Sequence, residues 1–342
     1  METIWFCLVA VMIAVYVVLD GFDLGAGVIH LAVARTGAER KTVLRSIGPV
    51  WDGNEVWLLA GGGVMYFAFP ALYASSFSGF YLPLMMVLWL LILRGISIEF
   101  RNHIDNQVWA PMWDVVFSGA SALLAIFFGA ALGNVVRGVP LDREGGFFLP
   151  LWTDFTTGAN AGILDWYTVT VGLAALLTLT VHGALWVAMK TEGAVEERAG
   201  RLARLGWWGV LAFTILITLF SFAIQPQLRA SFDARPWGYV FPLVALVGLI
   251  GMRLMRNSQA FLCSGLFIIG MLTSAAFGVF PYVLPSNADP ALGLTVYNSA
   301  AAPYGLTVGL AWFIPGIILA SGYFVYVYRN FAGKVRLEEE GY

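Results

Sequence analysis

Two acidic residues lie where a membrane helix would not normally hold them. Asp20 and Asp23 belong to the stretch LDGFDLGAG, residues 19–27, inside an apolar run that begins at Ile4. An ionised carboxylate costs at least about 2.5–3.5 kcal/mol in hydrocarbon, so acids within membrane spans usually have a function. Their i, i+3 spacing places both on one helix face, and neither can be a cap in mid-helix. We therefore interpret the stretch as more than an anchor.

Two further apolar stretches contain ionisable residues, PVWDGNEVWLLAGGG (49–63) and LILRGISIEFR (91–101). Closely placed acids inside a membrane commonly relay protons, because coupled carboxyl groups exchange protons with one another. Arg94 would keep one carboxylate ionised, and Asn54 would hydrogen-bond a neighbouring group or a water molecule. The pattern predicts a proton route made of Asp20, Asp23, Asp52, Arg94 and Glu99, supported by Trp51, Asn54 and Glu55.

Each of these features also has a purely structural interpretation. Asp52 followed by Glu55 matches a capping box at a helix start. The tryptophans of the second stretch are typical of the membrane interface, where we place Trp57. Glu99 and Arg101 are also compatible with solvated charges at a helix end. The glycines of these stretches are typical of close helix packing.

The composition indicates a polytopic membrane protein. Of the 342 residues, 59% are hydrophobic and 12% are charged, and the mean hydropathy is +0.79, whereas soluble domains contain about 25% charged residues. A net charge of −2 without a basic stripe excludes nucleic acid as a partner. Cys7 and Cys263 lie far apart in apolar runs, so we expect neither a disulfide nor a metal site from them.

Nine apolar stretches are long enough to span a membrane, which takes roughly 20 residues. They cover residues 4–30, 52–71, 76–98, 113–135, 160–189, 205–226, 237–254, 259–284 and 304–328. Fourteen of the 19 lysines and arginines, including Arg336 in the C-terminal tail, follow odd-numbered stretches; four lie in the opposite loops and Arg94 lies within a stretch. Because basic loops stay in the cytoplasm, we expect the N-terminus outside and the C-terminus inside.

This topology brings the polar residues to one depth. Asp20 would lie about 15 Å from the cytoplasmic end of its helix, because a helix rises 1.5 Å per residue. The second stretch starts and the third stretch ends at the same side. We therefore expect the acids and Arg94 to gather in one cytoplasmic pocket. The whole chain is expected to form one integral-membrane domain, with candidate repeat halves at 1–135 and 159–285 and an extra helix at 304–328.

The histidine content bears on haem binding. Of the three histidines, only His182 lies plainly within a span. A haem usually needs such an axial ligand facing into a helix bundle, but a single intramembrane histidine also serves as a hydrogen-bonded packing residue. The sequence contains no Walker-type glycine loop, CxxC pair or HExxH motif. We expect no catalytic residue, cofactor ligand or metal ligand in this chain.

Six motifs occur in the order found in one known family: DGFDLGAG (20–27), PVWDGNEVWL (49–58), FPALYASSFSGFY (69–81), LRGISIEFR (93–101), GNVVRGVP (133–140) and FPYVLPS (280–286). On these motifs the chain resembles subunit II of the cytochrome bd-type quinol oxidases. The first four motifs are the most specific, and the length and nine-span pattern extend the resemblance over the whole chain. Residues 142–279 match in spacing rather than in motif.

The resemblance implies a respiratory complex of the prokaryotic inner membrane that oxidises quinol and reduces dioxygen to water. Its two b-type haems and one d-type haem would lie in a larger partner subunit, and a small single-helix subunit is a further candidate partner. The implied fold is all-α, with two four-helix bundles plus a peripheral helix. Subunit II would stabilise the haem-bearing subunit and supply part of a cytoplasmic proton route.

Residue matching carries particular positions over from that family. Asp52, Arg94 and Glu99 fall on positions tied to the proton route, whereas Trp51, Asp20 and Asp23 fall on its surrounding motifs. Position 99 is Glu where the family also shows Asp, which keeps the acid and lengthens its reach. The run NSAAAPYGLT at 298–307 departs from a Ser- and Thr-rich run, which places any role of such hydroxyl groups here in doubt.

Two other hypotheses remain open on the residues alone. A proton-coupled secondary transporter would use buried acids in the same way, although transporters favour a midplane site in broken helices. A structural partner protein would keep the acids only to hold its fold. A visible absorption spectrum of the purified protein with its partners would separate an oxidase from a transporter.

Overall fold

The computed structural model describes residues 1–104, 106–158 and 160–335. Its long helices are α1 (Glu2–Val33), α3 (Trp51–Ala68), α5 (Tyr81–Phe100), α6 (Trp109–Arg137), α7 (Trp166–Lys190), α8 (Gly193–Ile224), α10 (Val240–Leu254), α11 (Asn257–Val279) and α12 (Pro303–Asn330). The shorter elements are α2 (Gly37–Ile47), α4 (Pro70–Gly79), α9 (Pro226–Ala234), the 3-10 turns η1 (Pro236–Tyr239) and η2 (Pro290–Leu292), and the antiparallel strands β1 (Tyr282–Leu284) and β2 (Leu294–Thr295). The fold is all-α, as predicted.

Each predicted span overlaps one long helix, with shifted ends. Among the described residues, eight helices are long and apolar enough to cross a membrane; α3 is not among them, and its first two turns contain Asp52, Asn54 and Glu55. The count of nine spans therefore stays a prediction.

Four boundaries were placed wrongly. Asp165 caps α7 where the predicted span began at 160, and α11 ends at Val279 before the strand β1. Helix α5 begins at Tyr81 rather than 76, and α8 begins at Gly193 rather than 205.

The segment between the first two predicted spans, expected to be a loop, contains the helix α2. The Thr36 side chain accepts from the Glu39 N–H at 3.2 Å, and Glu39 in turn accepts from the Thr36 N–H, which completes a capping box. The Glu39 carboxylate also accepts from the Arg35 N–H at 2.6 Å and pairs with Arg198 of α8. The Arg35 bond is the main reason that the pKa of Glu39 lies below its usual value.

Helices α1 and α7 cross at the centre of the bundle, where glycines let their backbones meet. A Cβ atom on Gly25 would lie 1.9 Å from the Leu179 carbonyl oxygen and 2.8 Å from the Gly183 Cα. The packing interpretation of the first glycine stretch is therefore confirmed. For the second stretch it stays a prediction: a Cβ atom on Gly61 would lie 4.0 Å from Met12, and one on Gly62 or Gly63 would meet nothing within 4 Å in the described chain.

Two groups of four helices meet where α7 packs against α1 and α6. Helix α1 packs against α3 and α6, α7 packs against α8 and α11, and the remaining neighbours pair as α5 with α6 and α10 with α11. This is the arrangement that two four-helix bundles would have. The division of the sequence into repeat halves stays a prediction.

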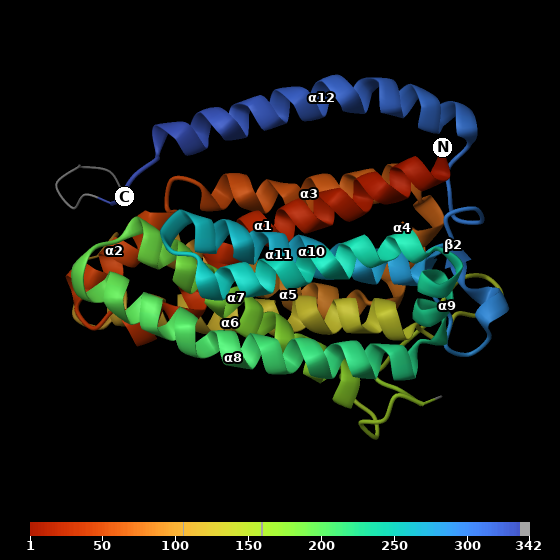
Figure 1. Ribbon diagram of the computed structural model, residues 1–342, viewed down its shortest axis with the longest axis horizontal. Coiled ribbons are helices and arrows are strands. Elements are labelled where there is room, and N and C mark those ends of the chain that lie inside the picture. The colour runs from red at the N-terminus through yellow and green to blue at the C-terminus, as the bar shows by residue number, and fades with distance from the viewer. Residues whose placement is uncertain (105, 159, 336–342) are drawn as a thin grey trace.

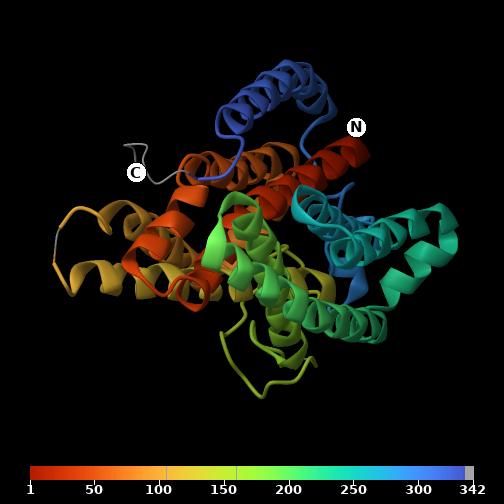
Figure 2. The ribbon, with the colours of Figure 1, turned by 60° about the vertical axis from the view of Figure 1, so that its left-hand side comes forward.

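Helix α12 lies apart from the other helices in both overall views (Figures 1 and 2). Along it, Leu306 is the buried residue, and aromatic side chains bridge to the bundle. Phe324 packs against Trp57 at 5.4 Å between ring centroids, and Trp57 is 9% exposed. Our placement of Trp57 at the membrane interface was therefore wrong, because this ring fills the space between α3 and α12. The helix matches the predicted extra helix 304–328.

The N-terminus and the start of α12 lie at one end of the molecule with α9 and β2, and α2 and the far end of α12 lie at the other end (Figure 1). An odd number of spans requires this arrangement. We refer to the α2 end as the cytoplasmic end, following the predicted orientation. Arg336, one of the basic residues behind that prediction, lies outside the described residues.

Candidate functional site

An ion pair between Asp20 and Arg94 is buried in the first four-helix group. The Arg94 guanidinium of α5 donates to Asp20 Oδ1 of α1 at 2.6 Å and to Glu55 Oε2 of α3 at 2.8 Å. Asp20 is 0% exposed and Arg94 is 1% exposed, whereas the Glu55 side chain is 22% exposed. A single cation thus joins three helices and two carboxylates. Arg94 was predicted to face one acid, but it faces two.

Asp23 lies one turn further along the same face of α1 and has a different partner. Asn54 Nδ2 donates to Asp23 Oδ2 at 2.7 Å, as expected for a neighbouring group. The Tyr328 hydroxyl of α12 donates to Asn54 Oδ1 at 2.8 Å. Asp23 is 1% exposed and Asn54 is 0% exposed, and the two aspartates interact electrostatically. These two hydrogen bonds link the helices α1, α3 and α12 through polar atoms.

Several polar atoms around these pairs have no hydrogen-bond partner within the described part of the chain. They are Tyr16 Oη, Asp20 Oδ2, Asp23 Oδ1 and Arg94 Nε, all buried. Buried polar atoms normally find a partner in the protein or in ordered water. The group formed by Tyr16, Asp20, Asp23, Asn54, Glu55 and Arg94, called here the buried acid cluster, is therefore suited to a hydrated interior.

Asp52 and Glu99 do not join the buried acid cluster. Both are exposed, and both line a cavity of about 360 Å³ between the start of α3 and the end of α12. Trp51 and Tyr328 also line it. The capping-box interpretation of Asp52 and Glu55 was wrong: Val50 occupies the N-cap of α3 without a side-chain bond, and Asp52 lies inside the helix.

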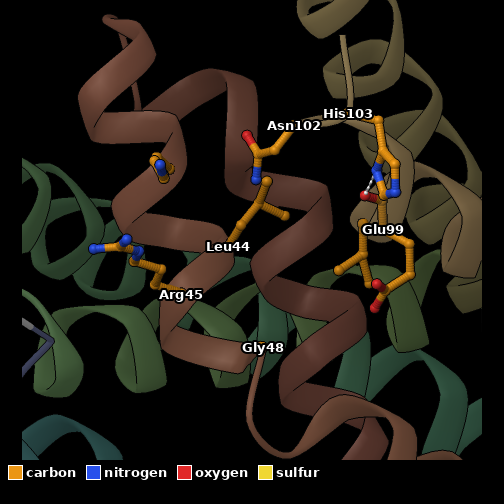
Figure 3. Close-up of a pocket in the computed structure, with 8 residues that line it drawn as sticks. Leu44, Arg45, Gly48, Glu99, Asn102 and His103 are labelled. Atoms are coloured by element: carbon orange, nitrogen blue, oxygen red, sulfur yellow. Dashed lines mark hydrogen bonds between the residues drawn. The ribbon is translucent and has the colours of Figure 1, made fainter. Parts of the chain in front are cut away.

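A second cavity of about 290 Å³ lies between α2 and the end of α5 (Figure 3). Glu99 and His103 lie on one side of it, and Leu44 and Arg45 of α2 lie on the other. Glu99 and Gly48 line both cavities. The single predicted pocket is thus divided: two cavities share Glu99, and the buried acid cluster is linked to the larger one through Tyr328, which lines that cavity and donates to Asn54.

A second buried ionic group, which was not predicted from the sequence, lies near the cytoplasmic end. Asp114 of α6 accepts from Arg101 at 2.5 Å and from Arg40 at 3.1 Å, and its Oδ1 lies 2.7 Å from His30 Nε2. His30 and Asp114 are both at most 1% exposed, and Arg101 is buried rather than solvated. The available signal was an acid at the second residue of a predicted span, preceded by a loop that contains Arg101.

His182 is buried and held by the protein on both ring nitrogens. Its Nε2 donates to the Val18 carbonyl at 2.9 Å, and its Nδ1 lies 2.7 Å from Ser264 Oγ. Both ring nitrogens therefore have partners in the protein, as the packing interpretation requires, and neither is free to bind a haem iron. No group of three metal-binding side chains occurs among the described residues. The side chains of this region do not fit a haem site.

Comparison with known proteins decides the family. The sequence model of cytochrome bd terminal oxidase subunit II matches residues 1–331. The chain belongs to this family. A probable cytochrome oxidase subunit 2 of Haemophilus influenzae is 30% identical, covering 97% of this chain and 94% of that protein. Cytochrome bd ubiquinol oxidase subunit 2 of Bacillus subtilis is 27% identical, covering 96% of each chain.

Further relatives agree with this subunit II assignment. The cytochrome bd-I ubiquinol oxidase subunit 2 of Escherichia coli K12 is 27% identical over 98% of this chain and 95% of its own length. A chain in the structure of the bd oxidase from Geobacillus thermodenitrificans superposes with a TM-score of 0.72, at 19% identity, covering 96% of this chain and 98% of its own; this likeness supports the fold. Subunit II is a multi-pass protein of the bacterial inner membrane. The family match favours an oxidase subunit over a transporter.

Proposed function

We propose that this subunit II carries protons from the cytoplasm toward the site of dioxygen reduction in a cytochrome bd-type quinol oxidase. Quinol would be the substrate of the complex. The two b-type haems and the d-type haem would be held by the larger subunit I, which this chain would also stabilise, and a small third subunit is a further candidate partner. The observation that carries the proposal is the buried, incompletely partnered acid cluster, which Tyr328 links to the larger of two cavities at the cytoplasmic end.

The route begins at the cavities. Glu99 lines both of them and Asp52 lines the larger, so acidic groups face the space through which water reaches the protein. Exposed carboxylates collect protons from bulk water and pass them to neighbouring acids within a hydrogen-bonded network. Both residues therefore suit the uptake of protons.

Glu55 is the step between the cavities and the interior. It follows Asp52 by one helical turn, interacts electrostatically with it, and keeps its side chain 22% exposed while pairing with Arg94. A carboxylate with one oxygen on a fixed cation and the rest near water can exchange protons without leaving its place. Arg94 itself stays charged and does not carry the proton.

Asp20 and Asp23 form the inner end of the route in this chain. Asp20 keeps Oδ2 free of protein partners, Asp23 keeps Oδ1 free, and the Tyr16 hydroxyl is likewise unpartnered. Asp20 is paired with the Arg94 guanidinium, whereas the partner of Asp23 is an uncharged amide. Asp23 is therefore the carboxyl group of the pair that is suited to pass protons toward the partner subunit.

Oxygen consumption by the complex tests this proposal. Asp52→Asn and Glu99→Gln each remove one titrating group at the surface of the cavities, where folding is little affected. We expect slower turnover with the haem absorbance unchanged. Glu197→Gln, at an exposed acid of α8 that lines neither cavity, is the matched control. Normal turnover and proton uptake in both cavity variants would mean that the acids serve the fold alone.

A further inference from the structure

Tyr328 is the residue through which α12 reaches the buried acid cluster. Its hydroxyl donates to Asn54 Oδ1 at 2.8 Å, and Asn54 Nδ2 donates to Asp23 Oδ2 at 2.7 Å. Asn54 is fully buried and Asp23 is 1% exposed. One continuous hydrogen-bond chain therefore runs from α12 through α3 to α1.

The two ends of the Asn54 amide differ, which gives this series of hydrogen bonds a direction. Asn54 has an oxygen that accepts and a nitrogen that donates, and it has no proton to pass on by titration. Because the Tyr328 hydroxyl occupies the oxygen, the nitrogen is left facing the carboxylate of Asp23. A reversed amide would set its oxygen against the carboxylate oxygen of Asp23 and against the Leu19 carbonyl, which lies 3.4 Å from Nδ2. These two acceptors select the orientation of the amide, and the Tyr328 hydroxyl holds the amide oxygen in place from the other side.

Tyr328 also belongs to the wall of the larger cavity, together with Asp52 and Glu99. The same side chain therefore contacts the space from which protons would come and the amide that faces the inner acid. Its ring lies 6.4 Å from that of Phe324, which packs on Trp57, so aromatic contacts hold it against α3.

The end of α12 that contains Tyr328 is tied to the bundle. Lys190 Nζ donates to the carbonyl of Phe331 at 2.5 Å and to that of Gly333 at 3.1 Å, and the Val335 N–H donates to the Lys190 carbonyl at 2.8 Å. These bonds lie three to seven residues beyond Tyr328 along the chain. They fix the position of its hydroxyl although most of α12 stands apart from the bundle (Figure 2).

We propose that Tyr328 is a positioning residue of the proton route, which holds the Asn54 amide with its N–H toward Asp23 and so keeps that carboxylate in the geometry for proton exchange. This role presupposes the proton route proposed above. It gives the peripheral helix α12 a part in turnover.

The hydroxyl group can be removed alone. Tyr328→Phe should lower kcat for quinol oxidation by the purified complex about three- to tenfold, the effect of one lost hydrogen bond. KM for quinol and the haem absorbance should stay unchanged. Tyr326→Phe is the control, because Tyr326 lies on the same helix and is 64% exposed. Asn54→Leu should lower kcat at least as far, and Tyr328→Phe combined with it should add nothing.

The outcomes separate this role from the proton route itself. Normal turnover in Asp23→Asn would overturn the proton route, and the role of Tyr328 with it. A slow Asp23→Asn complex beside a normal Tyr328→Phe complex would overturn the role of Tyr328 alone. Additive losses of kcat in the double variant of Asn54→Leu and Tyr328→Phe would also overturn the role of Tyr328. A loss of haem in Tyr328→Phe would do the same, because either result would mean that the contact is structural.

Discussion

Replacing Arg94 with methionine tests how much the buried ion pair contributes to the fold. The guanidinium is 1% exposed and donates to Asp20 at 2.6 Å and to Glu55 at 2.8 Å. Methionine retains much of the apolar stem and removes the charge. Asp20 is then left buried without a cation, whereas Glu55 still reaches solvent. Because removing one partner of a buried pair costs about 3–5 kcal/mol, we expect a loss of that size in the free energy of unfolding.

Removing the carboxylate as well should restore most of the stability. A buried pair replaced on both sides by apolar residues is often neutral, so Arg94→Met with Asp20→Leu should lie within about 1 kcal/mol of the wild type. The corresponding coupling energy is at least about 2 kcal/mol. SDS titration of the purified complex in detergent micelles, followed by tryptophan fluorescence, gives these values.

Arg253→Met is the matched control, because Arg253 is exposed at the end of α10, and exposed substitutions change stability by about 0.5 kcal/mol or less. A loss below about 1 kcal/mol for Arg94→Met would contradict the picture of an uncompensated buried charge. Strictly additive effects of the two substitutions would contradict it as well.

Two further predictions concern the packing and the cytoplasmic surface. Gly25→Ala should destabilise the complex by about 1–3 kcal/mol, because the added Cβ atom meets backbone that cannot move aside. Gly119→Ala should not, because a Cβ atom there meets nothing within 4 Å. Equal melting temperatures of these two variants would contradict the prediction. Glu39→Gln should lower the melting temperature near neutral pH. The pKa of Glu39 is lowered in the fold mainly by the Arg35 N–H, so its contribution is complete above pH 4.5 and is lost as the pH falls through the folded value. The two proteins should therefore converge in acid, and a difference that persists there would contradict the assignment.

Hydrophobic length and residue spacing were sufficient to predict the helical fold and the inner part of the site. An acid pair at i, i+3 on an apolar helix must share a face, and Asp20 and Asp23 do. Their partners Arg94 and Asn54 were also found from sequence, because an isolated cation or amide inside an apolar stretch needs a polar neighbour.

Other features depend on contacts that no local pattern encodes. Helix α2 is short and polar, so it lacked an apolar signal, and its stability comes from its cap and from Arg198 of a distant helix. The ionic group around Asp114 joins residues from four segments and is visible only once they are folded together. Tyr328 was likewise one tyrosine among several on α12, and only the fold places its hydroxyl on Asn54.

The central claim is that protons reach the partner subunit through this chain, and proton uptake measured during a single turnover tests it most directly. The complex would be reconstituted in vesicles with a pH-sensitive dye on the side of α2, and oxygen added to the reduced enzyme. For Asp23→Asn we expect uptake at least about tenfold slower than in the wild type, a barrier increase of about 1.4 kcal/mol or more, with full haem absorbance. Uptake at the wild-type rate in that variant would contradict the account.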